Sequence, residues 1–398
     1  DIMFILNYCR INRRKYISGE GGNVLVCAHR YSVRDVDRVS RQPIDSKRAM
    51  LGMCYILQPD LTLPRTTSIG AKNILVVREA LRGKRLELIN DFDNHAKFGV
   101  CQVGTSAGWI KKNLSGAQDE NYALFGAPGC FTWRGNVLGQ RTGTTGSYET
   151  AVHEDNYLGY TKHGHLGLSV TSGNYFNDDL IYASGAPHVN GGVSGSGEIY
   201  FFKQSTATSK LEMLASRTLR GGGFGAGFGY SLETIDINRD GMDDLIVGAP
   251  FTEHEAGGGS VFIYLNHDGH LDSSNYIEIQ GATRDSQFGL SLASLGDINK
   301  DGFQDLAVGA PYEDAGVVYV LLGSASGLAG LKRNRRTVSA VEVASQIIRG
   351  SDLAADSHTP TNPALATFGS SLSGGMDLDN NNYPGRNSYK NELLLKSL

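Results

Sequence analysis

Two nine-residue stretches carry the side chains in this sequence that are best suited to bind a metal ion. They read DINRDGMDD at 236–244 and DINKDGFQD at 297–305, and each runs into an apolar segment that ends in Gly-Ala-Pro. Oxygen-bearing side chains stand at the first, third, fifth and ninth positions, and a glycine follows the fifth. Alternate side chains of a tight loop can converge on one point, and hard oxygen donors suit Ca²⁺, which accepts six to eight of them.

The sequence therefore predicts calcium-binding hairpins in which a backbone carbonyl at the seventh position adds to the side-chain ligands. The expected ligands are Asp236, Asn238, Asp240, Asp244 and the carbonyl of Met242 in the first hairpin, and Asp297, Asn299, Asp301, Asp305 and the carbonyl of Phe303 in the second. A third copy at 377–385 keeps Asp377, Asp379, Asn381 and the carbonyl of Tyr383, but Gly385 replaces the ninth-position carboxylate. Only the first two ligand sets are complete.

Three other structures could produce the same pattern. An EF-hand needs a bidentate Glu at its twelfth position between helices, but Val247 and Val308 stand there, inside strand-like runs. A polar turn with local side-chain hydrogen bonds would leave three carboxylates to repel one another without a cation. Catalytic carboxylates need a cleft and a neighbouring base, and the histidines form no Ser/His/Asp or His-x-x-x-His pattern. Structural calcium in a protein that is not an enzyme is the preferred interpretation.

An internal repeat organises the rest of the chain. Gly-Ala-Pro recurs at intervals of about 60 residues, and an apolar residue followed by glycine precedes each copy. These pairs are Phe98-Gly99, Leu158-Gly159, Phe228-Gly229 and Phe288-Gly289, and a fifth pair is Phe368-Gly369. Short runs rich in β-branched and aromatic residues, such as 260–266 and 316–323, lie between the motifs. Repeats of this length with about four strands predict an all-β propeller; a β-solenoid is the alternative.

Composition limits the classes of partner. The chain of 398 residues has a formal charge of −4, which argues against nucleic acid as a partner because phosphate binding needs a basic face. No stretch approaches the roughly 20 apolar residues of a membrane-spanning helix. We expect the chain to be part of a longer protein whose transmembrane segment lies outside it.

The five cysteines all lie in the first third of the chain, without Cys-x-x-Cys spacing, so zinc and thioredoxin-type redox chemistry are not expected. Cys27 and Cys54 could form a disulfide or remain buried thiols. The sequon at Asn113 is a candidate glycosylation site and fits a secreted context.

The combination of Phe-Gly, a nine-residue calcium hairpin and Gly-Ala-Pro resembles the FG-GAP repeats of the integrin α-subunit propeller. The resemblance covers residues 21–385 and implies a seven-bladed β-propeller, incomplete at blades one and seven. A poorly matching remnant (1–20) precedes it, and a non-matching tail (386–398) follows. VCAHRY (26–31) with LGMCYILQ (51–58) is similar to the second blade, whose paired cysteines imply a Cys27–Cys54 disulfide. The family's usual partner for Cys101 is absent, which leaves Cys101 free or paired irregularly, with Cys130 as the candidate.

The same resemblance implies a cell-surface adhesion receptor. Residues 58–97 leave no room for the inserted ligand-binding domain that some members carry. The chain would pair with an integrin β subunit, on the extracellular side of the membrane, and bind an extracellular-matrix protein. CAHRY is most similar to the laminin-binding subclass, which implies laminin as that ligand.

The residue after Phe-Gly faces the central channel in relatives, where aromatic rings cage a basic residue of the β subunit by cation–π contact. Tyr160 and Tyr230 match this role, whereas Leu290 and Ser370 depart from it. Structural packing of the two tyrosines is the alternative.

Two functions of another kind stay open on the sequence. One is an accessory propeller of a secreted enzyme, such as a glycosylphosphatidylinositol phospholipase, whose repeats look similar; that enzyme would need a zinc-bearing catalytic domain. The other is a glycan-binding propeller. The CAHRY stretch and the paired-cysteine pattern favour the integrin.

Overall fold

The computed structural model describes residues 24–30, 32–36, 43–57, 99–112, 120–141, 148–150, 164–176, 180–190, 193–204, 211–255, 257–331, 336–355 and 367–374. Their regular secondary structure is almost entirely β-strand. The helical segments α5 (Cys130–Trp133), η1 (Ala215–Arg217), α6 (Ala340–Val343) and α7 (Gly350–Ala355) are all short. No helix within the described ranges is long and apolar enough to cross a membrane.

The chain divides into two compact units. The first, called the N-terminal unit, comprises residues 1–171, 184–189 and 200–217, and the second, called the C-terminal unit, comprises 172–183, 190–199 and 218–398. The proposed remnant at 1–20 and tail at 386–398 lie outside the described residues.

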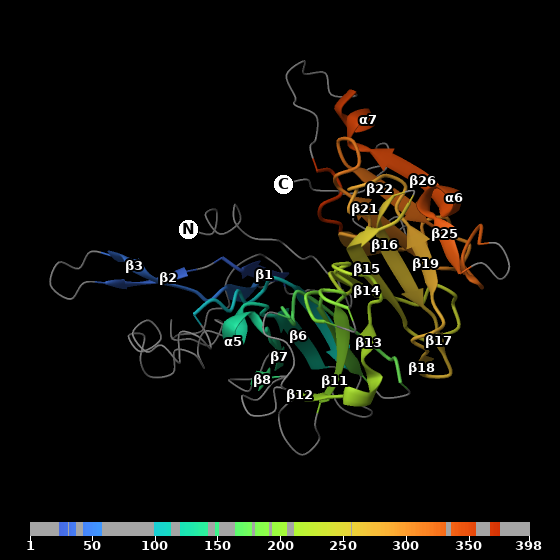
Figure 1. Cartoon of the computed structure of the whole chain (residues 1–398). Coiled ribbons are helices and arrows are strands. Elements are labelled where there is room, and N and C mark those ends of the chain that lie inside the picture. Colours follow the sequence, from blue (N-terminus) through green and yellow to red (C-terminus); the bar gives the residue numbers. More distant parts are fainter. Residues whose placement is uncertain are drawn as a thin grey trace. The chain divides into compact units, whose positions relative to one another are not determined.

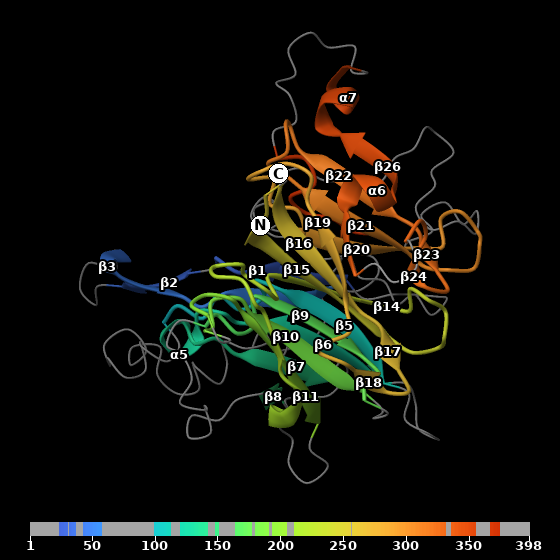
Figure 2. The same ribbon diagram turned by 45° about the vertical axis from the view of Figure 1, so that its right-hand side comes forward.

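Two sheets make up most of the C-terminal unit (Figure 1). The strands of the first are β14 (Ser231–Ile235), β15 (Asp244–Glu253), β16 (Gly258–Tyr264) and β19 (Ile277–Gln280), antiparallel in that order, with β25 (Thr337–Ser339) added parallel to β19. Those of the second are β20 (Ser291–Gly296), β21 (Asp305–Ala310), β22 (Val317–Leu321) and β26 (Ala344–Arg349). The edge strands β14 and β20 contact each other, and Figure 2 shows the two sheets side by side.

A short hairpin follows the third strand of each sheet. It is β17 (Asn266–His267) with β18 (His270–Leu271) in the first, and β23 (Gly323–Ser324) with β24 (Gly327–Leu328) in the second. The core between the sheets holds mostly β-branched residues, whose stiff side chains favour extended backbone. Its members include Ile246, Val261, Ile263, Val308 and Val317, none of which is exposed.

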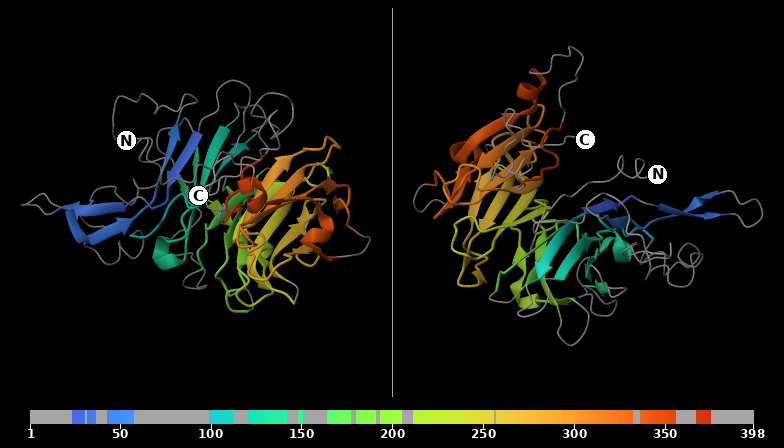
Figure 3. Two further views of the ribbon diagram at one scale, coloured as in Figure 1. Left: turned by 90° about the horizontal axis from the view of Figure 1, so that it is seen from above. Right: turned by 180° about the vertical axis from the view of Figure 1, so that it is seen from behind.

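The N-terminal unit contains a sheet of the same antiparallel design. Its strands are β5 (Ala107–Lys112), β6 (Glu120–Gly126), β7 (Val137–Arg141) and β8 (Tyr148–Thr150), in that order. Two strand pairs precede it (Figure 3): β1 (Val24–Ala28) with β4 (Met53–Leu57), and β2 (Ser32–Val36) with β3 (Pro43–Met50).

One further, five-stranded sheet contains residues that belong to both units. It consists of β9 (Ser169–Gly173), β10 (Ile181–Ala186), β11 (Glu198–Gln204), β12 (Leu211–Met213) and β13 (Leu219–Arg220), in the order β12-β11-β10-β9 with β13 also on β11. Each repeat of about 60 residues is thus a sheet of four main strands, which confirms the all-β, propeller-type fold predicted from the sequence.

The position of the Phe-Gly motif was predicted correctly in the later repeats and wrongly in the earlier ones. Gly229 and Gly289 have φ of 86° and 88°, and their N–H groups donate to the carbonyls of the Gly-Ala-Pro glycines Gly248 and Gly309, at 3.1 and 3.0 Å. In the N-terminal unit the N–H of Gly104 donates to the carbonyl of Gly126 at 2.9 Å, and the N–H of Gly167 donates to the carbonyl of Gly185 at 3.2 Å.

The motif is therefore Val103-Gly104 and Leu166-Gly167 in the structure, and not Phe98-Gly99 and Leu158-Gly159. The repeat requires a glycine with positive φ after a buried apolar side chain, and valine or leucine meets that requirement as well as phenylalanine. In the first of these repeats the aromatic ring of Phe98 pointed to the wrong pair, and in the second one Leu-Gly pair was taken for another.

At three places a serine two residues after a motif glycine donates to the motif glycine of the following repeat. Ser231 and Ser291 donate to the carbonyls of Gly289 and Gly369, each at 2.6 Å. In the N-terminal unit Ser106 donates to Gly167, at 2.8 Å. The Gly-Ala-Pro glycine lies against the same carbonyl, so closely that any Cβ there would meet the carbonyl oxygen at about 2 Å. This paired arrangement is called the serine–glycine joint below.

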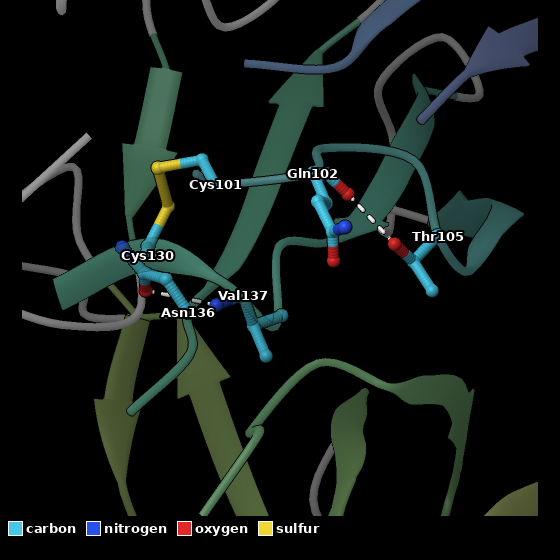
Figure 4. Close-up of a disulfide and its surroundings, with 6 residues drawn as sticks. All are labelled: Cys101, Gln102, Thr105, Cys130, Asn136 and Val137. Atoms are coloured by element: carbon cyan, nitrogen blue, oxygen red, sulfur yellow. Dashed lines mark hydrogen bonds between the residues drawn. A yellow bond between two sulfur atoms is a disulfide. The ribbon is translucent and has the colours of Figure 1, made fainter. Parts of the chain in front are cut away.

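Two disulfides close the N-terminal unit. Cys27 and Cys54 face each other on β1 and β4 and are bonded, as the family resemblance implied. Cys101 is bonded to Cys130 at the start of α5, so the irregular pairing is the one observed (Figure 4). Cys9 lies outside the described residues.

Short hydrogen bonds surround the second disulfide. The Thr105 hydroxyl donates to the carbonyl of Gln102, and the Asn136 side chain accepts the N–H of Val137, both at 2.8 Å (Figure 4). The disulfide thus ties two loops that are each held by their own bonds.

Candidate calcium-binding hairpins

The two predicted metal loops connect the first and second strands of the sheets in the C-terminal unit. Residues 236–243 join β14 to β15, and residues 297–304 join β20 to β21. The hairpins close at the pairs Ile235↔Asp244 and Gly296↔Asp305. No helix flanks either loop, which agrees with the rejection of an EF-hand. The third copy at 377–385 lies outside the described residues.

The first and fifth residues of each loop organise its backbone. In the first hairpin the two carboxylate oxygens of Asp236 accept the N–H groups of Asp240 and Gly241, at 3.1 and 3.0 Å. Asp240 then accepts the N–H of Met242 at 2.9 Å and the side-chain amide of Asn238 at 2.9 Å. The second hairpin repeats every one of these bonds, within 0.2 Å, at residues 297–303.

Left-handed backbone turns allow the loops to close this tightly. Arg239 and Lys300 have φ of 58° and 60°, and Gly241 and Gly302 have φ of 86° and 95°. Only glycine adopts the latter values without steric cost. The glycine after the fifth position is therefore needed for the turn.

The ninth-position carboxylates are buried completely. Asp244 accepts the N–H groups of Ile237 and Asn266, at 3.0 and 2.8 Å, and has no exposed surface. Asp305 accepts those of Ile298 and Gly323, at 2.8 and 3.0 Å, and is equally buried. Neither makes an ion pair with Lys or Arg among the contacts of the described residues.

Burial is also the main electrostatic perturbation here. It raises the pKa of Asp244 to about 7, although the two N–H bonds act in the opposite direction, and the nearby Asp240 and Asp236 raise it further. The pKa of Asp305 is raised for the same reasons. A negative charge at either position is costly unless a cation compensates for it.

The donor set fits calcium in type, and it reaches six ligands when one carboxylate binds through both oxygens. Each loop has three carboxylates, one amide oxygen and a backbone carbonyl, all hard oxygen ligands. Most carboxylate oxygens accept one hydrogen bond and have a second lone pair. The described side chains do not, however, gather three or more His, Cys, Asp or Glu groups around one point. The loop backbone is therefore formed, whereas the carboxylates bind the loop's own N–H groups.

One polar cluster was not found from the sequence, because its members come from three strands or loops. His254 Nε2 lies 2.6 Å from Ser260 Oγ, and Ser260 Oγ donates to Glu278 Oε1 at 2.9 Å. A catalytic triad would place the carboxylate on the other ring nitrogen, Nδ1, but here Glu278 lies 3.7 Å from the same Nε2. Ser260 is fully buried, so the cluster has the geometry of a core hydrogen-bond network.

Of the two tyrosines expected at a subunit interface, the structure describes Tyr230. The ring of Tyr230 lies edge-on to that of Phe251, with centroids 5.5 Å apart. Tyr160 and Asn113 lie outside the described residues. With the motif corrected to Leu166-Gly167, the residue in the repeat that corresponds to Tyr230 is Leu168 and not Tyr160.

Comparison with known proteins agrees with these features. The FG-GAP repeat model matches residues 228–264 and 288–321, which contain the two hairpins. The chain is 34% identical to integrin alpha-6 of Gallus gallus over 382 residues, and 33% identical to integrin alpha-7 of Rattus norvegicus. A third relative, integrin alpha ina-1 of Caenorhabditis elegans, is 30% identical over 371 residues.

These alignments cover 92%, 92% and 84% of the chain, but 31%, 28% and 28% of the relatives. The chain thus spans about a third of their length. All three are integrin α subunits, which agrees with the expectation of a protein that is not an enzyme and favours the integrin over an accessory propeller. The repeats, the hairpins and the alignments together show that the chain belongs to the integrin α family and contains its FG-GAP repeat region.

Proposed function

We propose that the chain is the propeller head of an integrin α subunit that pairs with an integrin β subunit in a cell-surface adhesion receptor. The alignment over nearly the whole chain with integrin alpha-6, alpha-7 and alpha-3 carries this proposal. The matrix ligand is a laminin-type protein, a choice that rests on similarity to these three relatives and on the CAHRY stretch at 27–31. The membrane-spanning segment belongs to the longer protein.

In this proposal calcium stabilises the propeller and does not contact the matrix protein. The groups proposed to coordinate calcium are those of the two complete loops, and the third copy at 377–385 is proposed as a weaker calcium site. The buried carboxylates Asp244 and Asp305 support the assignment, because a divalent ion would compensate for charges that have no basic partner among their contacts. To coordinate it, the carboxylates would exchange some N–H bonds for the ion while the loop backbone stays as it is.

Tyr230 is the proposed contact for a basic residue of the β subunit. Its edge-on packing against Phe251 leaves Phe251 with 39% of its surface exposed, so aromatic surface is available beside it. A cation over such a ring gains about 0.5–2 kcal/mol. In its repeat Leu168, and not Tyr160, holds the corresponding place, so the role is proposed for Tyr230 alone; Asn113 is the proposed glycosylation site.

Co-expression tests the pairing directly. The chain, extended with the rest of its ectodomain, should form a complex with an integrin β head from the same source that survives size-exclusion chromatography in calcium. Tyr230→Ala should weaken it several-fold, whereas Val341→Ala, at an exposed apolar residue on α6, should not.

The ligand is tested separately on immobilised laminin, collagen and fibronectin. The purified heterodimer should bind laminin above the other two. If no β head forms a complex, the receptor function is wrong; if a heterodimer forms but prefers another matrix protein, only the laminin assignment falls.

A further inference from the structure

Three loops of the N-terminal unit meet at Trp133, His165 and His188. The N–H of His165 donates to the carbonyl of Trp133 at 3.0 Å, and the N–H of His188 donates to that of Gly164 at 3.4 Å. The rings follow the backbone: centroids are 5.3 Å apart for Trp133 and His165, and 4.4 Å apart for the two histidines. The Nδ1 atoms of His165 and His188 lie 2.9 Å apart at the surface.

The backbone around this group is strained. Phe131, Thr132 and Trp133 have φ of 54°, 58° and 63°, and His165 has φ of 58°. A left-handed conformation costs a residue other than glycine about 1–2 kcal/mol. The Cys101–Cys130 disulfide fixes the start of this turn. Backbone outliers held in place by their surroundings concentrate at functional sites.

The fold itself does not require histidine at these places. His188 follows Gly-Ala-Pro, as Phe251 and Tyr312 do, and the N–H groups of those two make the corresponding bonds to Ala226 and Ser286. His165 precedes Leu166-Gly167, as Gln287 precedes Phe288-Gly289. The corresponding pairs are therefore Gly227 with Phe251 and Gln287 with Tyr312. Among the repeats that the structure describes, two imidazoles meet at this place in one alone.

We propose that His165 and His188 bind a transition-metal ion, Cu²⁺ in preference to Zn²⁺, through their two Nδ1 atoms. Imidazole nitrogens bind such ions at about 2.0–2.1 Å. Two nitrogens 2.9 Å apart then subtend roughly 90° at the ion, the angle of tetragonal Cu²⁺ or Ni²⁺ sites. A tetrahedral Zn²⁺ site would need them about 3.3 Å apart.

The two imidazoles carry the same number of protons before and after the ion binds. Without metal, one Nδ1–H donates to the other Nδ1. On binding, that proton is lost to solvent and one is taken up at the Nε2 of the same ring, and the two rings turn until both Nδ1 lone pairs converge on the ion, so two neutral imidazoles bind with no net proton release. The described residues add no third His, Cys, Asp or Glu ligand, so water completes the coordination.

Trp133 provides the readout, because paramagnetic Cu²⁺ quenches a nearby indole. The chain has two tryptophans, so a Trp109→Phe background makes Trp133 the single reporter. Titration with CuCl₂ in calcium-containing, non-coordinating buffer should quench it saturably. ZnCl₂ should restore the fluorescence only at a higher concentration than the Cu²⁺ it displaces, and further calcium should not.

Substitutions taken from another repeat supply variants that the fold accepts. His165→Gln and His188→Tyr place the residues of the Gln287–Tyr312 pair at the site, and each should raise the midpoint at least about tenfold, the scale of losing a metal ligand's support. The control His267→Gln/His270→Gln removes two exposed histidines in another hairpin and should leave the midpoint unchanged. Equal midpoints in all variants, or no saturable quenching, would overturn the proposal.

Discussion

The hairpins at 236–244 and 297–305 share every internal hydrogen bond, yet their surroundings differ. In the first, the side-chain amide of Asn266 donates to the carbonyls of Asn174 and Asp243, at 3.0 and 3.2 Å, and Asp243 accepts the N–H of Asn174 at 2.8 Å. In the second, Gly323 and Gln304 occupy the corresponding positions, and a Cβ on Gly323 would collide with the carbonyls of Gln304 and Ile237.

The first loop is thus held by side-chain hydrogen bonds, whereas Gly323, beside the second loop, lies directly against main-chain carbonyls. The other shared bonds lie within the nine residues of each loop, and the ninth-position Asp accepts one more from the start of the next short hairpin. The support outside those nine residues varies from repeat to repeat. Experiments on the two loops can therefore separate what calcium contributes from what the neighbours contribute.

Removing calcium should have the largest effect, since the proposed sites lie in both loops. At a free calcium concentration ten times the Kd, each site adds about 1.4 kcal/mol to the free energy of unfolding, so two sites add about 3 kcal/mol. Differential scanning calorimetry in millimolar calcium and in excess EGTA should show a drop in Tm of several degrees. Equal Tm values in the two buffers would rule out structural calcium.

Asp244→Asn and Asp305→Asn should each remove about half of that calcium effect. The neutral amide keeps an acceptor for one N–H but lacks the charge that the ion requires. Each variant should therefore lose more stability in calcium than in EGTA, by about 1.4 kcal/mol. Glu255→Gln, at an exposed carboxylate, is the matched control. Equal losses in both buffers would mean that the carboxylates serve only as hydrogen-bond acceptors.

Asp243→Ala and Gln304→Ala test whether the side chain at the eighth position of each loop stabilises it through contacts outside the loop. Loss of the Asn174 bond should cost about 1 kcal/mol in the first hairpin, in calcium and in EGTA alike. Gln304→Ala, at an exposed position, should change the free energy of unfolding by less than about 0.5 kcal/mol. Urea denaturation of the two variants provides the comparison, and equal effects would remove the distinction between the loops.

The smallest difference is expected between Gly241→Ala and Gly302→Ala. Both should lose about 1 kcal/mol to the left-handed backbone. The space around Gly241 is open, whereas a Cβ on Gly302 would displace the guanidinium of Arg239, which would lie 2.1 Å away. Gly302→Ala should therefore melt slightly lower, and the Arg239→Ala background should abolish the gap. A gap that persists there would assign it to another contact.

Local patterns could be predicted from the sequence, and contacts between distant residues could not. The hairpins were placed correctly because the bonds within each loop join residues at most seven apart, up to the ninth-position Asp. The Phe-Gly motif was misplaced in two repeats because a buried valine or leucine serves as well as phenylalanine. The Ser260–His254–Glu278 network and the His165–His188 pair depend on strand register and on loops more than 20 residues apart, which spacing alone does not reveal.

The serine–glycine joint affects how the repeats resist unfolding under a pulling force. Each joint uses a main-chain carbonyl of the following repeat, so one repeat cannot unravel without exposing its neighbour's edge. Stability then accumulates as nearest-neighbour terms along the chain. A pulling force on these repeats would be resisted by the three hydroxyl–carbonyl hydrogen bonds, and deleting a whole repeat should destabilise the fold less than cutting through the middle of one.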